Sequence, residues 1–223
     1  RPKNPAAPAA AAASNMAVIF VTGSDTGVGK THVAGLLARR MARDGFTQVI
    51  KPVESGAAAG RPADALKAAG KWAEAHTLLT LPAPIAPLAA AKKARKQLDL
   101  ATLLKLYRAV PLAPCRVVES AGGVAVPIDP KGKDWSDFAA AIKPMAVIIV
   151  VEDRLGAINQ ARLAIAYLRR RYDGPMGVWL NAIKKPTPAV AAANRAGLAD
   201  AWIPLYGESG PGKKPPRFHF LPR

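Results

Sequence analysis

The residues best suited to chemistry stand in the glycine-rich run FVTGSDTGVGKTH at positions 20–32. Its Gly-Lys-Thr ending is typical of a phosphate-binding loop, in which backbone N–H groups surround the phosphates. In such a loop Lys30 reaches the β- and γ-phosphates, and the hydroxyl of Thr31 binds magnesium. The usual pattern places a glycine five residues before the glycine of Gly-Lys-Thr. Ser24 stands there instead, and the glycine lies one residue earlier, at Gly23.

An apolar run before the loop and a helical pattern after it give the strand–loop–helix context that phosphate binding requires. We therefore expect the nucleotide to be held by Asp25, Thr26, Gly27, Val28, Gly29, Lys30 and Thr31. Partitioning-type ATPases carry a second lysine at the position of Asp25. The aspartate indicates a nucleotide-binding loop of another kind.

Polar side chains also follow two later apolar runs. Lys51 opens the segment KPVESG at the end of one run, and Glu119 ends another. Ligands of open α/β sheets bind at the carboxyl ends of the strands, so Lys51 is a candidate second cation and Glu119 a candidate magnesium ligand. Taken alone, Asp64 is either an acid at a helix start or a second metal ligand. Ser55 is either a substrate ligand or an ordinary loop residue.

Short apolar runs alternate with helical patterns along the chain. We predict strands over 17–21, 48–53, 115–120, 145–151, 176–183 and 203–207, and helices over 31–45, 63–76 and 156–171. Continuous β-branched runs separated by helices predict a parallel sheet covered on both faces. The prediction is a single P-loop NTPase-like α/β domain over 16–223, doubly wound and mostly parallel. A flexible Ala- and Pro-rich extension is expected over 1–15.

The charge is strongly basic, with 32 Lys and Arg against 15 Asp and Glu and a net charge of +17. Such a balance favours polyanionic partners, but the cations are scattered and no aromatic residues are interleaved with them. We expect solvated faces, no specific nucleic acid and no membrane partner. No apolar run is long enough to span a bilayer, and the single Cys115 excludes an internal disulfide. A soluble, cytoplasmic protein is expected.

Six motifs together resemble the dethiobiotin synthetase family. In chain order they are VTGSDTGVGKT, KPVESG, DAL at 64–66, VESAGGVAVP, RLGAIN at 154–159 and LNAI at 180–183. The displaced glycine of the first motif is the family's own form. The resemblance implies that 7,8-diaminononanoate, CO₂ (from bicarbonate) and MgATP give dethiobiotin, ADP and phosphate. The expected route passes through a carbamate and a carbamic-phosphoric anhydride.

The resemblance also implies a role for each matching residue. It assigns catalysis to Lys30, Lys51 and Thr26, substrate binding to Lys51 and Ser55, and magnesium to Thr31, Asp64 and Glu119, with Glu119 and Asn181 added to the nucleotide set. Asn181 corresponds to the family's adenine-binding asparagine.

The resemblance further implies a homodimer with sites at the subunit interface. In the family, the far carboxylate of the substrate meets a helix N-terminus of the other subunit. The matching residues here are Leu155, Gly156, Ala157, Ile158 and Asn159. A helix N-terminus carries about half a positive charge and suits a carboxylate.

Two departures from the family pattern stand out. Ser120 replaces a glycine, and the ending GESGPGKKPPRFHFLPR lacks the Trp-Leu-acid stretch that follows Gly-Glu in the family. Two alternatives therefore stay open. One is a related P-loop nucleotide-binding protein with another acid substrate. The other is a basic switch ATPase that acts on nucleic acid or a membrane.

Overall fold

The computed structural model describes residues 16–57 and 63–211, so the extension predicted for 1–15 and most of the divergent ending lie outside the described part. Seven strands form one sheet in the order β3-β2-β4-β1-β5-β6-β7, and every pair is parallel. Their bounds are β1 Ala17–Gly23, β2 Thr47–Ser55, β3 Glu74–Leu81, β4 Cys115–Glu119, β5 Ala146–Glu152, β6 Met176–Asn181 and β7 Leu205–Ser209. The predicted doubly wound α/β fold is confirmed.

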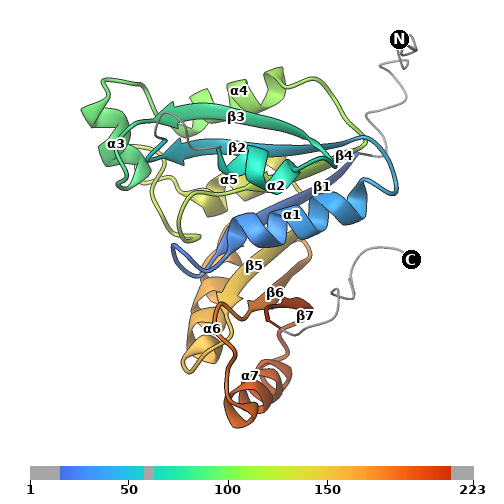
Figure 1. The fold of residues 1–223 in the computed structure, drawn as a ribbon. Coiled ribbons are helices and arrows are strands. Elements are labelled where there is room, and N and C mark those ends of the chain that lie inside the picture. The colour runs from blue at the N-terminus through green and yellow to red at the C-terminus, as the bar shows by residue number, and fades with distance from the viewer. Residues whose placement is uncertain (1–15, 58–62, 212–223) are drawn as a thin grey trace.

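Helices cover both faces of the sheet (Figure 1). Their bounds are α1 Lys30–Met41, α2 Asp64–Ala69, α3 Pro87–Lys93, α4 Leu100–Ala109, α5 Trp135–Ile142, α6 Ala157–Leu168 and α7 Pro188–Asp200. α1 and α2 bury one apolar cluster against the sheet, with Leu37 and Met41 fully covered. The remaining helices bury a larger cluster on the opposite face, centred on Phe20, Trp135 and Phe138. The two cores hold the sheet rigid between them.

β1 lies in the middle of the sheet, between β4 and β5. The register pairs Val21 with Glu119 on one side and Gly23 with Val150 on the other. Because all strands are parallel, their carboxyl ends meet at one edge. That edge carries the glycine-rich loop, the end of β2 and the end of β4.

One predicted helix is wrong in its second half. The helix expected over 63–76 ends at Ala69, where Gly70 takes a positive φ of 51°, and Glu74–Leu81 forms the edge strand β3. The segment EAHTLLTL begins with good helix formers. Its apolar residues do not alternate with polar ones, since an edge strand is only partly covered. The segment becomes a strand because it pairs with β2. The last strand begins at Leu205, two residues later than predicted.

Four helices were not predicted, although three carry readable start signals. Asp99 caps α4 by accepting a hydrogen bond from the N–H of Thr102 at 2.7 Å. Asp134 and Asp137 form a capping box at α5, and Thr187 caps α7 just before a proline. Across 16–57 and 63–211, no helix combines the length and apolarity needed for crossing a membrane.

Candidate active site

The phosphate-binding loop connects β1 to α1 at the carboxyl edge of the sheet. Gly29 precedes the first turn of α1 with φ 93°, and no side chain caps that helix. The first N–H groups of α1 therefore lack partners within the helix and face the loop. α1 also has no acidic residue in its first turn. This arrangement suits an anion.

The structure explains the displaced glycine. A Cβ atom on Gly23 would lie 3.0 Å from the carbonyl oxygen of Asp25 and 3.0 Å from Cγ2 of Val28. The loop folds back so closely on Gly23 that a side chain there would force its neighbours to shift. Ser24 instead turns its hydroxyl toward Gln160 of α6, at 3.4 Å. The close approach favours a glycine where the chain has it, and Ser24 fits where the general pattern has a glycine.

Lys30 lies buried inside the loop. Its Nζ donates to the carbonyl oxygen of Asp25 at 2.8 Å. Burial, together with the nearby ammonium of Lys51, lowers the pKa of Lys30 to about 8. A bound phosphate would favour the charged form again, because an opposite charge stabilises the ammonium.

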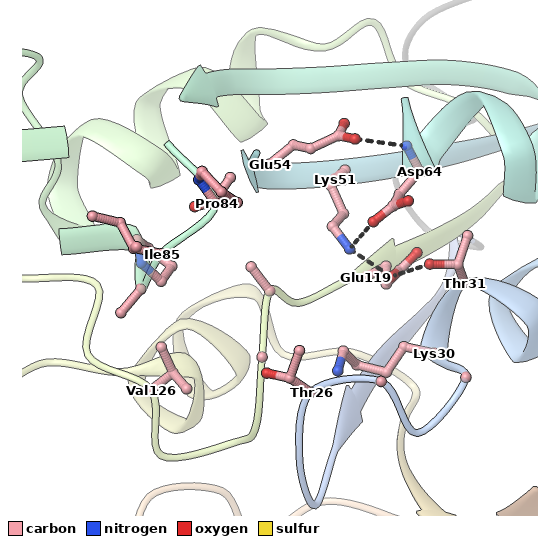
Figure 2. Close-up of a pocket in the computed structure, with 17 residues that line it drawn as sticks. Thr26, Lys30, Thr31, Lys51, Glu54, Asp64, Pro84, Ile85, Glu119 and Val126 are labelled. Atoms are coloured by element: carbon pink, nitrogen blue, oxygen red, sulfur yellow. Dashed lines mark hydrogen bonds and ion pairs between the residues drawn. The ribbon is translucent and has the colours of Figure 1, made fainter. Parts of the chain in front are cut away.

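The predicted second cation lies among the predicted magnesium ligands (Figure 2). Nζ of Lys51 is 2.5 Å from Oε1 of Glu119 and 3.3 Å from Oδ2 of Asp64. The hydroxyl of Thr31 donates to the same Oε1 of Glu119 at 2.9 Å. Four residues from four separate chain segments thus meet at one point.

Two carboxylates and a hydroxyl are the hard oxygen donors that Mg²⁺ prefers. Oε2 of Glu119 is buried and has no hydrogen-bond partner among the residues that the structure describes, so it can accept a cation. Burial opposes the ionisation of Asp64, but the ammonium groups of Lys51 and Lys67 outweigh it and hold the pKa of Asp64 below its usual value. Asp64 therefore stays ionised. The donor set fits a magnesium ion.

These groups line a cavity of about 610 Å³. The predicted residues that line it are Thr26, Gly27, Gly29, Lys30, Thr31, Lys51, Ser55, Asp64 and Glu119. The hydroxyl of Ser55 is buried and finds no hydrogen-bond partner within 16–57 and 63–211, which leaves it available to a ligand.

Three predicted nucleotide residues do not line this cavity. Asp25 is exposed, and its carboxylate accepts a hydrogen bond from the N–H of Thr26 at 2.6 Å. Val28 is buried under the loop. Asn181 ends β6 behind the loop, where its Nδ2 donates to the carbonyl oxygen of Val28 at 2.9 Å.

Sequence analysis missed one wall of the cavity. The unpredicted residues are Glu54, Pro84, Ile85, Ala86, Pro87, Ala121, Gly122 and Val126. Most are apolar and come from the segment after β3 and the segment after β4. The Pro84–Pro87 part went unnoticed because β3 and α3, which position it, were not predicted. Glu54 accepts a hydrogen bond from the N–H of Asp64 at 2.9 Å, and so fixes the start of α2.

The serine that replaces a family glycine is accommodated without strain. Ser120 is fully buried, its φ is not positive, and its hydroxyl donates to Oγ1 of Thr22 at 2.9 Å. The positive φ occurs two residues later, at Gly122, where a Cβ would lie 2.9 Å from Val126.

The predicted carboxylate-binding helix start lies apart from this cavity. Leu155, Gly156, Ile158 and Asn159 line a separate groove of about 850 Å³ between α6 and α7. Ala157 is buried beneath it. Leu155 is 82% exposed at the rim of this groove.

Known proteins match both the fold and the sequence. A ParA family ATPase from Chlorobium tepidum TLS superposes with a TM-score of 0.54 at 12% identity, covering 90% of this chain and 86% of that chain. A plasmid partition protein from Borrelia burgdorferi gives 0.53 at 13% identity, with 88% and 90% coverage. At such low identity these likenesses concern the fold alone. Fold and loop define a P-loop nucleotide-binding protein.

Sequence relatives narrow the class. A family model described as an AAA domain matches residues 17–203. An ATP-dependent dethiobiotin synthetase from Anaeromyxobacter dehalogenans (strain 2CP-C) is 39% identical over 170 residues, which cover 73% of this chain and 75% of that protein. One from Paramagnetospirillum magneticum is 32% identical over 201 residues, covering 81% and 93%. The chain belongs to the ATP-dependent dethiobiotin synthetase family, as its motifs predicted.

Proposed function

We propose that this protein is an ATP-dependent dethiobiotin synthetase of biotin biosynthesis. It joins 7,8-diaminononanoate and CO₂ at the expense of ATP and closes the cyclic urea of dethiobiotin. The observation that carries the proposal is the meeting of Lys30, Lys51, Thr31, Asp64 and Glu119 at one edge of the sheet, around a single cavity. Family membership supplies the substrates.

The two lysines offset the charge repulsion that opposes the reaction. A carbamate and a γ-phosphate are both anionic and repel each other at attack distance, so preorganised cations must lie between or beside them. Lys30 and Lys51 both reach the cavity, one from the loop and one from β2. The carbamate oxygen then takes the γ-phosphoryl group, and the second amine displaces phosphate as the ring closes.

Other side chains of the cavity bind and orient. Thr26 lines the cavity from the loop side, and its hydroxyl would act where the carbamate and the phosphate meet. The unpartnered hydroxyl of Ser55 is available to the substrate. The apolar wall that includes Ile85 and Val126 suits the aliphatic chain of diaminononanoate, since apolar surfaces gain by leaving water together.

Magnesium would be held by Thr31, Asp64 and Glu119. When bound, it neutralises charge on the β- and γ-phosphates. Lys51 neutralises the same carboxylates through its short contacts to Glu119 and Asp64. The unpartnered Oε2 of Glu119 supports this assignment.

The proposed assembly is a cytoplasmic homodimer. The start of α6, from Leu155 to Asn159, would bind the far carboxylate of the substrate held by the other subunit. Exposed Leu155 and Leu163 on the groove between α6 and α7 support a covered surface there.

Phosphate release from ATP tests the proposed reaction. We expect release to require both 7,8-diaminononanoate and bicarbonate, with dethiobiotin formed in equal amount and measured by mass spectrometry. DNA and anionic lipid vesicles serve as comparison additions. Phosphate release that does not depend on the diamine and increases with DNA or with the vesicles would support the switch-ATPase alternative and contradict the proposal.

A further inference from the structure

Three buried side chains form a hydrogen-bonded chain that ends on the phosphate loop. Nε1 of Trp179 donates to Oγ of Ser209 at 2.9 Å, and Oγ of Ser209 donates to Oδ1 of Asn181 at 2.7 Å. Nδ2 of Asn181 then donates to the carbonyl oxygen of Val28 at 2.9 Å. All four residues are at most 5% exposed. Side chains alone therefore connect the end of β7 to the loop after β1.

The direction of this chain is fixed by its two ends. An indole N–H can only donate, so Trp179 donates to the oxygen of Ser209. A carbonyl oxygen can only accept, so Val28 takes a proton from the amide of Asn181, and the amide oxygen accepts the proton of Ser209. The oxygen of the Asn181 amide therefore faces Ser209, and the NH₂ group faces the loop. An asparagine without such a neighbour could turn either end of its amide toward the loop.

The NH₂ group of Asn181 in turn orients a peptide of the loop. In a trans peptide the C=O and the N–H point in opposite directions, and the described residues contain no cis peptide. When the carbonyl of Val28 points at Asn181, the N–H of Gly29 points away from it. Gly29 lines the cavity that we assign to the nucleotide.

Gly29 cannot hold this orientation by itself. Glycine populates positive and negative φ with similar ease, so the Val28–Gly29 peptide can rotate unless a contact prevents it. A larger residue would be strained at the φ of 93°, and its Cβ would lie 2.1 Å from Nδ2 of Asn181, so that the Asn181 side chain would have to shift. The contact with Asn181 therefore disfavours a side chain at position 29 and also restrains the peptide.

We propose that Ser209 is a positioning residue for phosphate binding. Acting through Asn181, it holds the Val28–Gly29 peptide so that the N–H of Gly29 faces the nucleotide phosphates. The proposal rests on the nucleotide role assigned to the loop above. Ser209 would then contribute to the affinity for the phosphates, and this contribution would not depend on the base of the nucleotide.

The test compares two ligands in variants of the full chain. ATP and inorganic tripolyphosphate, each with Mg²⁺, displace a fluorescent ATP analogue from the wild type, Ser209→Ala and Ser209→Thr. We expect Ser209→Ala to raise the Kd of both ligands by the same factor, roughly two- to tenfold, as for one lost hydrogen bond. Ser209→Thr keeps the hydroxyl and should restore most of the affinity.

A matched control removes a buried hydroxyl at the opposite edge of the sheet. The hydroxyl of Tyr172 donates to the carbonyl oxygen of Pro144 at 2.9 Å, before β5 begins. Tyr172→Phe should leave both affinities unchanged. If the alanine variant fails to fold, Ser209→Cys keeps the size with a weak donor and should weaken both ligands.

Two results would overturn the proposal. One is unchanged affinity for both ligands in a folded Ser209→Ala variant. The other is a loss for ATP alone, which would make Ser209 a base-recognition residue. A wild type that binds neither ligand would instead refute the nucleotide role of the loop, on which the proposal depends.

Discussion

Lys51 is a buried cation that contacts two carboxylates of the site. It is 4% exposed and contacts the carboxylates of both Asp64 and Glu119. Lys30 reaches the same cavity from the loop and is held by a backbone carbonyl. The two cations therefore have separate supports, and one can be removed without displacing the other.

We expect Lys51→Ala to lower turnover by about 10²- to 10³-fold, as for the loss of one preorganised charge partner. ATP affinity should change little, because the loop and Lys30 remain. Turnover and the Kd of ATP are measured side by side. Lys67→Ala is the matched control, since Lys67 contacts Asp64 at 3.1 Å from the exposed side. An equal loss of turnover and ATP affinity in Lys51→Ala would move Lys51 from the reaction centre to nucleotide binding.

Residues that end a strand or follow a glycine-rich loop could be predicted as site residues from the sequence. Lys30 and Glu119 belong to this group, because parallel topology brings the loop after β1 and the end of β4 together. Lys51 was predicted at a strand end but lies inside β2, which continues to Ser55. Glu54 could not be predicted, because nothing in KPVESG indicates that its carboxylate turns back toward the start of α2. Val126 was missed for a similar reason: only the folded loop after β4 brings it to the cavity.

At the scale of elements, α2 depends on a residue outside itself. Its N-cap position holds Ala63, which offers no side-chain acceptor. The carboxylate of Glu54 replaces the missing cap by accepting the N–H of Asp64 at 2.9 Å. The position of the Asp64 carboxylate thus depends on β2 as well as on its own helix.

Replacing Glu54 by alanine should loosen the start of α2 and raise the Mg²⁺ concentration needed for half-maximal rate several-fold. A hydrogen bond to a charged acceptor is worth about 1.5–3 kcal/mol, so urea unfolding should show a loss in that range. Glu54→Gln keeps an acceptor and should recover much of both quantities. An unchanged Mg²⁺ dependence in a folded Glu54→Ala variant would contradict the link between Glu54 and Asp64.

Strands with continuous apolar runs could be predicted from the sequence, and the edge strand that depends on its pairing partner could not. β1, β5 and β6 lie inside the sheet and are apolar up to their last one or two residues. β3 lies at the edge, where only its pairing with β2 decides its conformation. The ends of α4, α5 and α7 are fixed by local caps that the sequence already displayed.

At the scale of the whole molecule, a single chain does not show how its copies assemble. The groove between α6 and α7 leaves Leu155 82% and Leu163 63% exposed. Large exposed apolar side chains that lie together mark interaction surfaces more often than isolated ones do. The motif RLGAIN indicated the Leu155–Asn159 side of this surface. The α7 side could not be predicted, because it joins the groove only when α6 and α7 pack together.

We expect Leu155→Asp to weaken self-association in sedimentation velocity and to raise the KM for diaminononanoate. The reason is that a buried, unpaired charge at a subunit interface is costly. Trp202→Ser is a suitable control, because Trp202 is 92% exposed and lies outside the groove. A Leu155→Asp protein that sediments like the wild type would contradict the proposed dimer interface.

Stability should fall at high pH through a buried phenol. Burial, with smaller contributions from Tyr206 and Asp173, raises the pKa of Tyr172 from 10 to about 12. The folded state then keeps a proton that the unfolded state loses, so this contribution is full below pH 10 and lost by about pH 12. Urea midpoints measured from pH 8 to 11.5 should fall less steeply for Tyr172→Phe than for the wild type. Parallel curves would contradict the prediction.

The central place of β1 has a consequence for how the chain folds during synthesis. β1 is completed at Gly23, but its neighbours β4 and β5 begin only at Cys115 and Ala146. At about 5–20 residues per second, the first of these partners follows roughly 5–20 s later. Until then the strand AVIFVTG has neither of its sheet neighbours, and the loop that follows it lacks its frame. The phosphate-binding loop is therefore made well before the strands that frame it, and it is among the last segments to take its shape.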